Sequence, residues 1–207
     1  MSRSVRIALS KILAVGAHPD DVEIGCGATL SLFPERVVCV AFSTCDIADE
    51  WHQSMAVLRP HNKALYNLPK RELPHYQREI REYLEHLKTS FHPAIIFTHH
   101  PTNLHQDHRA VTENVLRIFK RETVLGYDTG GGGWFTPNLY VPVTREALAA
   151  KLAMLDCYGS QVRHEDGFKR YAIDIHNTEA TLIYHGAKVS REYAEAFELL
   201  RGVWPIA

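Results

Sequence analysis

Two short clusters of histidine and aspartate have the residue types of a catalytic metal site. They are His18-Pro19-Asp20-Asp21 and His105-Gln106-Asp107-His108. His18 and Asp21 are three residues apart, so a helical turn would bring one imidazole and one carboxylate to a common side. That pair is half of a zinc site, and one histidine of the second cluster would complete a set of His, Asp and His. Three protein ligands with the fourth position left to water are typical of catalytic zinc.

A site of this kind would carry out hydrolysis. Zinc lowers the pKa of a bound water from about 16 to about 7, which makes hydroxide available near neutral pH for attack on a carbonyl. Asp20 lies between His18 and Asp21 and would point to another side, so it could approach that water without being a ligand. Asp20 is therefore the candidate general base.

Simpler explanations exist for each cluster taken alone. Aspartates at the start of a helix favour the positive end of the helix dipole, and a neighbouring histidine can be incidental. The second cluster could be a solvated loop in a chain with 13 histidines. Both explanations lose weight if the two clusters lie on the same edge of a sheet. His99 and His100 are better explained as loop or core histidines, and they are left out of the ligand set.

The hydrophobic pattern predicts strands and helices in alternation. Strands are expected at residues 11–15, 36–42, 94–98, 123–127 and 171–175. Helices are expected from Pro19 onward, at residues 46–58, 74–87 and 144–158, after Asp107 as far as Phe119, and at residues 191–200. Pro19 suits the first position of its helix, with Asp20 and Asp21 in the first turn.

This alternation predicts an α/β protein with a Rossmann-like three-layer fold, in which a mostly parallel sheet has helices on both faces. Ligands of such folds lie beyond the carboxyl ends of the strands, and both clusters follow predicted strands there. We therefore expect the two clusters to meet. No linker or repeat divides the chain, so residues 1–207 are expected to form one domain. The four consecutive glycines at residues 130–133 are expected to form a mobile loop.

The composition argues against several classes of protein. Lys and Arg total 23 and Asp and Glu 24, so no surface for nucleic acid or an anionic membrane is indicated. No segment reaches the roughly 18 apolar residues of a membrane span, and the N-terminal segment lacks the apolar run of a signal peptide. The four cysteines have no CxxC spacing and are expected to be reduced thiols, which favours the cytoplasm. Gly25-Cys26-Gly27 lacks the third glycine of a dinucleotide fingerprint, so no nucleotide site is expected there.

The two clusters also resemble a known family. Residues 17–21 (AHPDD) together with residues 105–108 (HQDH) are similar to the signature pair of the PIG-L/LmbE-like N-deacetylases. The resemblance continues through residues 151–161, with their Lys and closing Ser-Gln, and through residues 193–197 near the end. It therefore extends over nearly the whole chain.

The resemblance implies a role for each polar residue of the two clusters. The implied metal ligands are His18, Asp21 and His108. Asp20 is implied to be the base that activates water, and His105 to stabilise the oxyanion or to protonate the leaving amine. Asp107 would orient His105, which is a usual role for a carboxylate next to an imidazole.

The family acts mostly on N-acetylglucosamine units carried on a lipid, a thiol precursor, an antibiotic or another sugar conjugate, and releases acetate and a free amine. The resemblance therefore implies a Zn²⁺-dependent N-deacetylase with a small-molecule amino-sugar substrate, and it leaves the oligomeric state open. The alternative is a zinc amidase that acts on a different N-acyl substrate. A sugar-binding protein on a degenerate deacetylase fold is a weaker alternative, because neither a ligand nor the base is replaced.

The sequence departs from common family patterns at three places. Asn103 stands where an Asp often precedes the HxDH motif, Pro142 lies in a strand that often carries Asp, and residues 43–46 lack a frequent Gly-Glu pair. These differences are expected to fall around the pocket and to affect which substrate is bound. Trp134 and Phe135 have two equal interpretations, a cap over a sugar face or a cover over the core.

Overall fold

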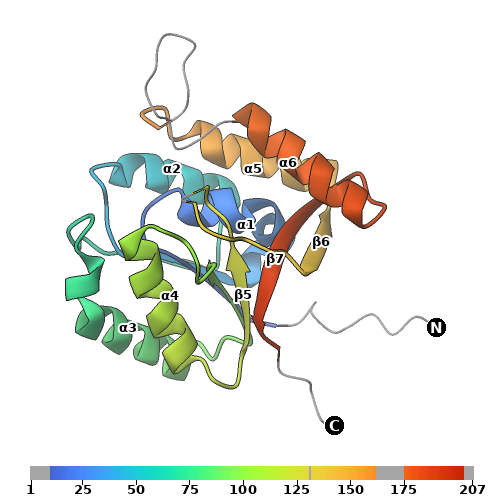
Figure 1. Ribbon diagram of the computed structural model, residues 1–207. Coiled ribbons are helices and arrows are strands. Elements are labelled where there is room, and N and C mark those ends of the chain that lie inside the picture. The colour runs from blue at the N-terminus through green and yellow to red at the C-terminus, as the bar shows by residue number, and fades with distance from the viewer. Residues whose placement is uncertain (1–9, 131, 162–174, 203–207) are drawn as a thin grey trace.

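The computed structural model describes residues 10–130, 132–161 and 175–202, which form a seven-stranded sheet between two layers of helices (Figure 1). The strands are β1 (Ile12–Gly16), β2 (Val37–Ala41), β3 (Asn62–Leu65), β4 (Ile95–His99), β5 (Thr123–Tyr127), β6 (Leu139–Val143) and β7 (Tyr193–Arg201). The α-helices are α1 (Asp21–Ser31), α2 (Ala48–Leu58), α3 (Gln77–Ser90), α4 (Gln106–Ile118), α5 (Arg145–Asp156) and α6 (Ile175–Lys188). Two short 3-10 helices are η2 (Pro34–Arg36) and η3 (Leu73–His75).

The sheet is mostly parallel, which confirms the predicted α/β class. Its strand order is β3-β2-β1-β4-β5-β7-β6. The first five strands of this order pair in parallel, whereas β7 is antiparallel to both β5 and β6. The chain leaves β1 toward β2 on one side and later returns to place β4 on the other side. The carboxyl ends of β1 and β4 therefore flank the switch point at which ligands bind in such folds.

Helices cover both faces of the sheet. α1, α2, α5 and α6 lie over one face, and α3 and α4 lie over the other (Figure 1). Because successive strand residues point to opposite faces, Ile12 and Ala14 pack toward α1 and α2, while Leu13 and Val15 pack toward α3 and α4. Burial on both sides explains why β1 is a continuous apolar run.

The strands expected in the first 130 residues are confirmed as β1, β2, β4 and β5, with bounds within one residue of those predicted. The sequence did not predict β3. Its four residues, Asn-Lys-Ala-Leu, are exposed or half-buried at the edge of the sheet, so they lack the apolar pattern of an inner strand.

The C-terminal part of the chain differs from the expectation. The helix predicted at residues 191–200 is wrong, because this segment is β7. Ala, Glu and Leu favour a helix, but residues 193–197 are buried and pair with β6 while residues 198–201 pair with β5, and this pairing outweighs the local propensity. The strand predicted at residues 171–175 lies outside the described residues except for Ile175, which begins α6, a helix that the sequence did not predict.

The cysteines, the helix lengths and the glycine run can be compared with the expectations from the sequence. All four cysteines are free, as predicted. None of the helices in the described part of the chain is both long and apolar enough to cross a membrane. In the glycine run, Gly130, Gly132 and Gly133 have φ of 73°, 79° and 105°, a backbone region that glycine adopts readily.

Candidate active site

The turn between β1 and α1 holds the first cluster. α1 begins at Asp21, and Asp20 is its N-cap residue with φ of 85°, so Pro19 precedes the helix and the prediction that it occupies the first helical position is wrong. The backbone N–H of His18 donates to Asp21 Oδ2 at 2.7 Å, which closes the turn. The backbone N–H of Asp20 donates to the Tyr158 hydroxyl at 3.0 Å. That bond supports a backbone conformation that residues other than glycine seldom adopt.

The second cluster lies where the chain enters α4. His105 is the N-cap residue of α4, and its Nδ1 accepts a hydrogen bond from the backbone N–H of Asp107 at 3.2 Å. The backbone N–H of His105 donates to Asn103 Oδ1 at 2.9 Å. Because Nδ1 is the acceptor, the ring proton of neutral His105 lies on Nε2.

The carboxyl ends of β1 and β4 bring the two clusters together. His108 Nε2 lies 3.2 Å from His18 Nδ1 and 3.4 Å from Asp21 Oδ1, and His18 Nδ1 lies 3.5 Å from Asp21 Oδ2. Donors about 2.0–2.1 Å from a tetrahedral zinc are about 3.4 Å apart, so these separations suit one ion. The two histidines contact different oxygens of Asp21. Two overlapping groups have donor atoms within 4.8 Å of one another, His18 with His105 and His108, and Asp21 with His99 and His108.

The Asp107 carboxylate contacts His18 rather than His105. Asp107 Oδ2 accepts from His18 Nε2 at 2.9 Å, and the carboxylate also accepts from the backbone N–H groups of Arg71 at 2.6 Å and Leu73 at 3.1 Å. The expectation that the Asp107 carboxylate orients His105 therefore differs from the structure, in which these two residues meet through the Asp107 backbone. A carboxylate that fixes the second nitrogen of a metal-binding imidazole is a frequent support, and here it leaves His18 Nδ1 free to face Asp21 and His108.

His99 is a core histidine, as expected, and its contact with Asp21 is what the sequence did not predict. It is fully buried, its Nε2 lies 3.3 Å from Asp21 Oδ2, and its ring stacks on that of His108 with centroids 3.8 Å apart. The backbone N–H of Ala17 donates to the same Nε2 at 3.2 Å. The signal that could have identified it is its position at the end of β4, the strand that leads to the second cluster.

The charges of the cluster favour a cation at its centre. Burial would lower the pKa of His18, but hydrogen bonds to Asp107 and Asp21 outweigh it and raise that pKa to about 10. Burial lowers the pKa of His108 to about 2, and the nearby Asp21 carboxylate opposes this effect without reversing it. Burial, reinforced by the Asp21 charge, holds the pKa of Asp20 well above its usual value. The Asp107 and Asp21 carboxylates thus stabilise a positive charge beside them.

The cluster opens into a cavity of about 180 Å³. Its walls contain the residues of both clusters except Gln106 and Asp107: His18, Pro19, Asp20, Asp21, His105 and His108. Ile24, Cys45, Ile47, Lys70, Thr129 and Gln161 complete its lining. Asn103 is buried and does not line it, and Pro142 is exposed on β6, so the expectation that these two residues fall around the pocket is wrong.

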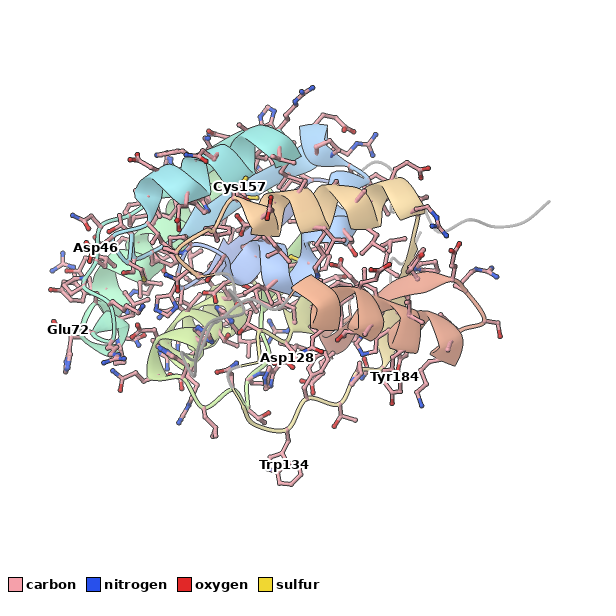
Figure 2. All side chains as sticks on the ribbon, turned by 90° about the horizontal axis from the view of Figure 1, so that it is seen from above. Asp46, Glu72, Asp128, Trp134, Cys157 and Tyr184 are labelled. Carbon is pink, nitrogen blue, oxygen red and sulfur yellow. The ribbon has the colours of Figure 1, made fainter. Side chains whose placement is uncertain are left out.

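A second cavity of about 320 Å³ adjoins the first one, with Ile24 and Thr129 lining both. It lies among α1, α5, α6, β7 and the loop after β5. In Figure 2 Asp128 of that loop lies beside α6, and Trp134 projects away from the body of the protein. Trp134 is 84% exposed and so does not cover the core, whereas the half-buried Phe135 lines the second cavity.

A mostly parallel α/β sheet that gathers imidazoles and carboxylates at its carboxyl edge is the arrangement of a metal-binding α/β enzyme. The family model of GlcNAc-PI de-N-acetylase (PIG-L) matches residues 13–119, more than half of the chain and both clusters. The chain belongs to this family of deacetylases, as the resemblance in the sequence implies.

Three known proteins are similar to this chain in sequence or in fold. The uncharacterized deacetylase YaiS of Escherichia coli (strain K12) is 28% identical over 163 residues, which are 70% of this chain and 88% of YaiS. The conserved protein TT1542 of Thermus thermophilus has a similar fold, with a TM-score of 0.76, 20% identity, and coverage of 96% of this chain and 98% of TT1542. The N,N'-diacetylchitobiose deacetylase of Pyrococcus horikoshii matches with a TM-score of 0.72, 20% identity, and coverage of 92% and 84%.

Proposed function

We propose that this protein is a Zn²⁺-dependent hydrolase that removes the N-acetyl group from an N-acetylglucosamine-type amino sugar or its conjugate. The observation that carries the proposal is the approach of His18 Nδ1, Asp21 and His108 Nε2 to within 3.5 Å of one another. Two imidazole nitrogens and a carboxylate are ligands that zinc prefers, and they leave a fourth position for water or substrate. Membership of a deacetylase family supports the reaction, and the similar fold of a deacetylase that acts on diacetylchitobiose supports the class of substrate.

His18, Asp21 and His108 would hold the metal. When bound, the ion would polarise the amide carbonyl and lower the pKa of water. The Asp107 carboxylate fixes the His18 ring through Nε2 at 2.9 Å, and the same carboxylate is anchored by two backbone N–H groups. The position of His18 Nδ1 is therefore set by α4 and by the loop that carries Arg71 and Leu73.

Asp20 would act as the base. Its side chain lines the catalytic cavity next to His18 and Asp21, and its backbone is held by Tyr158. It takes a proton from the attacking water. His105 lines the same cavity, and with its proton on Nε2 it donates a hydrogen bond to the developing oxyanion or a proton to the leaving nitrogen.

The remaining parts of the proposal concern partners and organisation. The substrate is a small molecule, and the near-balanced charge of the chain gives no basis for nucleic acid as a partner. We propose that residues 1–207 act as a single domain and that the reduced thiols suit the cytoplasm. A different N-acyl group on the substrate is the alternative, since the ligand set would be the same.

Two variants separate metal binding from base catalysis. Asp20→Asn is expected to keep zinc and lose most acetate release, because the amide cannot take the proton, whereas His108→Ala is expected to lose zinc itself. Metal content is measured by elemental analysis, and acetate is quantified with a panel of N-acetyl sugars. Asp49→Asn and His86→Ala, both at exposed positions, are the matched controls. Wild-type rates in Asp20→Asn would refute the base assignment, and turnover of other N-acyl compounds without N-acetyl sugars would favour the alternative.

A further inference from the structure

The adjoining cavity is a candidate subsite for the part of the substrate that carries the amino sugar. Resting on the proposed function, we propose that it binds an uncharged, hydroxyl-rich ring, such as a second sugar residue, and that it disfavours anionic carriers such as a nucleoside diphosphate. The residues that line this second cavity come from α1 and from the C-terminal part of the chain. Its lining is Ile24, Gly25, Asp128, Thr129, Gly130, Phe135, Lys151, Asn177, Thr178, Thr181, Leu182, His185, Glu195 and Ala196.

Size and position support this assignment. The catalytic cavity, at about 180 Å³, is smaller than the roughly 300–1,000 Å³ of typical ligand sites, whereas the adjoining cavity measures about 320 Å³. Ile24 and Thr129 line both cavities, so the two lie side by side. A substrate whose acetamide group lies beside Asp20 would therefore extend past Ile24 into the second cavity.

The charged groups of the second cavity indicate which substrates it takes. Its lysine, Lys151, is buried and donates to Glu195 Oε1 and to the Ile24 carbonyl oxygen, both at 2.6 Å. Glu195 also accepts from two backbone N–H groups of α1, so this ion pair is internally neutralised. Burial lowers the pKa of His185, which keeps its ring neutral at pH 7. Among the described residues that line the cavity, no cationic group is thus left to pair with a phosphate.

The remaining charge among the described lining residues of the cavity is a partly exposed carboxylate. The Asp128 side chain is 41% exposed, and its Oδ1 accepts from the backbone N–H of Gly130 at 2.9 Å and lies 3.5 Å from His100 Nε2. A carboxylate has about four acceptor positions, so Asp128 can still accept hydrogen bonds from ligand hydroxyl groups. Phe135 and Leu182 supply an apolar surface in the same cavity. Acceptors beside an apolar surface suit a ring with hydroxyl groups, and the negative charge repels a phosphate.

The test compares three substrates in the metal-loaded enzyme: N-acetylglucosamine, its β-linked N-acetylated disaccharide, and the uridine diphosphate conjugate. We expect kcat/KM to be highest for the disaccharide and lowest for the nucleotide conjugate. Asp128→Asn should lower kcat/KM for the disaccharide by about 10-fold, the loss of one hydrogen bond to a charged group, and change the monosaccharide much less. Asp128→Lys should raise kcat/KM for the nucleotide conjugate relative to the disaccharide. Asp156→Asn, exposed at the end of α5, is the matched control, and circular dichroism checks the fold of each variant.

The outcomes separate a failure of the subsite proposal from a failure of the proposed function. A disaccharide that is no better than the monosaccharide would overturn the subsite, as would a preference for the nucleotide conjugate or an equal loss on all three substrates in Asp128→Asn. If no substrate releases acetate, the proposed function fails, and calorimetry with the disaccharide then tests the subsite directly. Binding that is weakened in Asp128→Asn and unchanged in Asp156→Asn supports the subsite, and absent or equal binding in all three proteins overturns it.

Discussion

The buried hydroxyl of Tyr158 connects the backbone of the proposed base to the core. It accepts from the backbone N–H of Asp20 at 3.0 Å and donates to Glu23 Oε1 at 2.5 Å. Glu23 is fully buried, and its second hydrogen-bond donor is the Ser54 hydroxyl at 2.7 Å. Tyr158→Phe therefore deprives the Asp20 N–H of its acceptor and Glu23 of one donor.

The expected magnitude follows from these two groups. The Asp20 N–H left without an acceptor costs about 1–3 kcal/mol, and the hydrogen bond lost by Glu23, which keeps the Ser54 donor, costs about 0.5–1.5 kcal/mol, so Tyr158→Phe should lower the free energy of unfolding by about 1.5–4.5 kcal/mol. This is a large share of the stability of a typical domain, which is about 5–15 kcal/mol. Because Asp20 loses the bond that supports its φ of 85°, we also expect kcat to fall. Metal affinity should change little, because the proposed ligands make no contact with Tyr158 among the hydrogen bonds found in the described residues.

Urea unfolding followed by circular dichroism measures the first effect. Tyr140→Phe is the matched control, since the Tyr140 side chain is half-buried and its hydroxyl meets the Pro137 carbonyl oxygen at 3.5 Å. Zinc titration and acetate release measure the other effects in the folded protein. A loss of stability in Tyr158→Phe that is no larger than that in Tyr140→Phe would refute the reasoning, as would an unchanged kcat.

Three further substitutions test the packing and electrostatics. Gly25→Ala would place its Cβ on the ring of Tyr127 and should cost about 1–3 kcal/mol of unfolding free energy or more. Gly27→Ala would place its Cβ 3.1 Å from the flexible end of Met154 and should cost less. Thermal unfolding compares the two variants, and equal melting temperatures would contradict this difference. Lys151→Met leaves buried Glu195 without its cation and should lower the free energy of unfolding, measured with urea, by about 3–5 kcal/mol. The exposed control Lys120→Met should lower it by about 0.5 kcal/mol or less. A similar small loss of stability in both variants would show that the ion pair is not important for stability. Burial, with the Lys151 charge adding to it, lowers the folded pKa of His185 below its unfolded value of about 6.5, so the unfolded chain takes up the proton first. The contribution of His185 is therefore full above about pH 6.5 and is lost as the pH falls toward the folded pKa; urea midpoints at pH 5.5 and 7.5 should differ less in His185→Gln than in wild type, and an identical difference would contradict the assignment.

The sequence predicts the N-terminal part of the fold well, and the expectation that the two clusters meet is confirmed, for a physical reason. β1, β2, β4 and β5 are buried on both faces or nearly so, and their apolar runs end where polar residues begin. The two His/Asp clusters follow β1 and β4, and parallel strands bring such positions to one edge. The roles of His18, Asp21 and His108 as ligands, and those of Asp20 and His105, remain predictions.

The parts that the sequence does not predict depend on long-range contacts. β7 has helix-forming residues and becomes a strand because β5 and β6 offer pairing on both sides. The contact between the Asp107 carboxylate and His18 joins residues 89 positions apart, and it could not be distinguished from a contact with the neighbouring His105. His99 was set aside because a histidine after a strand is usually unremarkable, and its burial against Asp21 appears when the sheet is assembled.

The boundary of the family match separates two parts of the active-site region. Residues 13–119 contain every proposed ligand and the base, whereas Asp128, Phe135, α6 and β7 come after them in the chain. Apart from Ile24 and Gly25, the residues of the proposed carrier subsite therefore lie outside the family match, whereas the proposed reacting centre lies within it. A designer who wants to redirect the enzyme would mutate positions beyond residue 119 and leave the first half of the gene untouched.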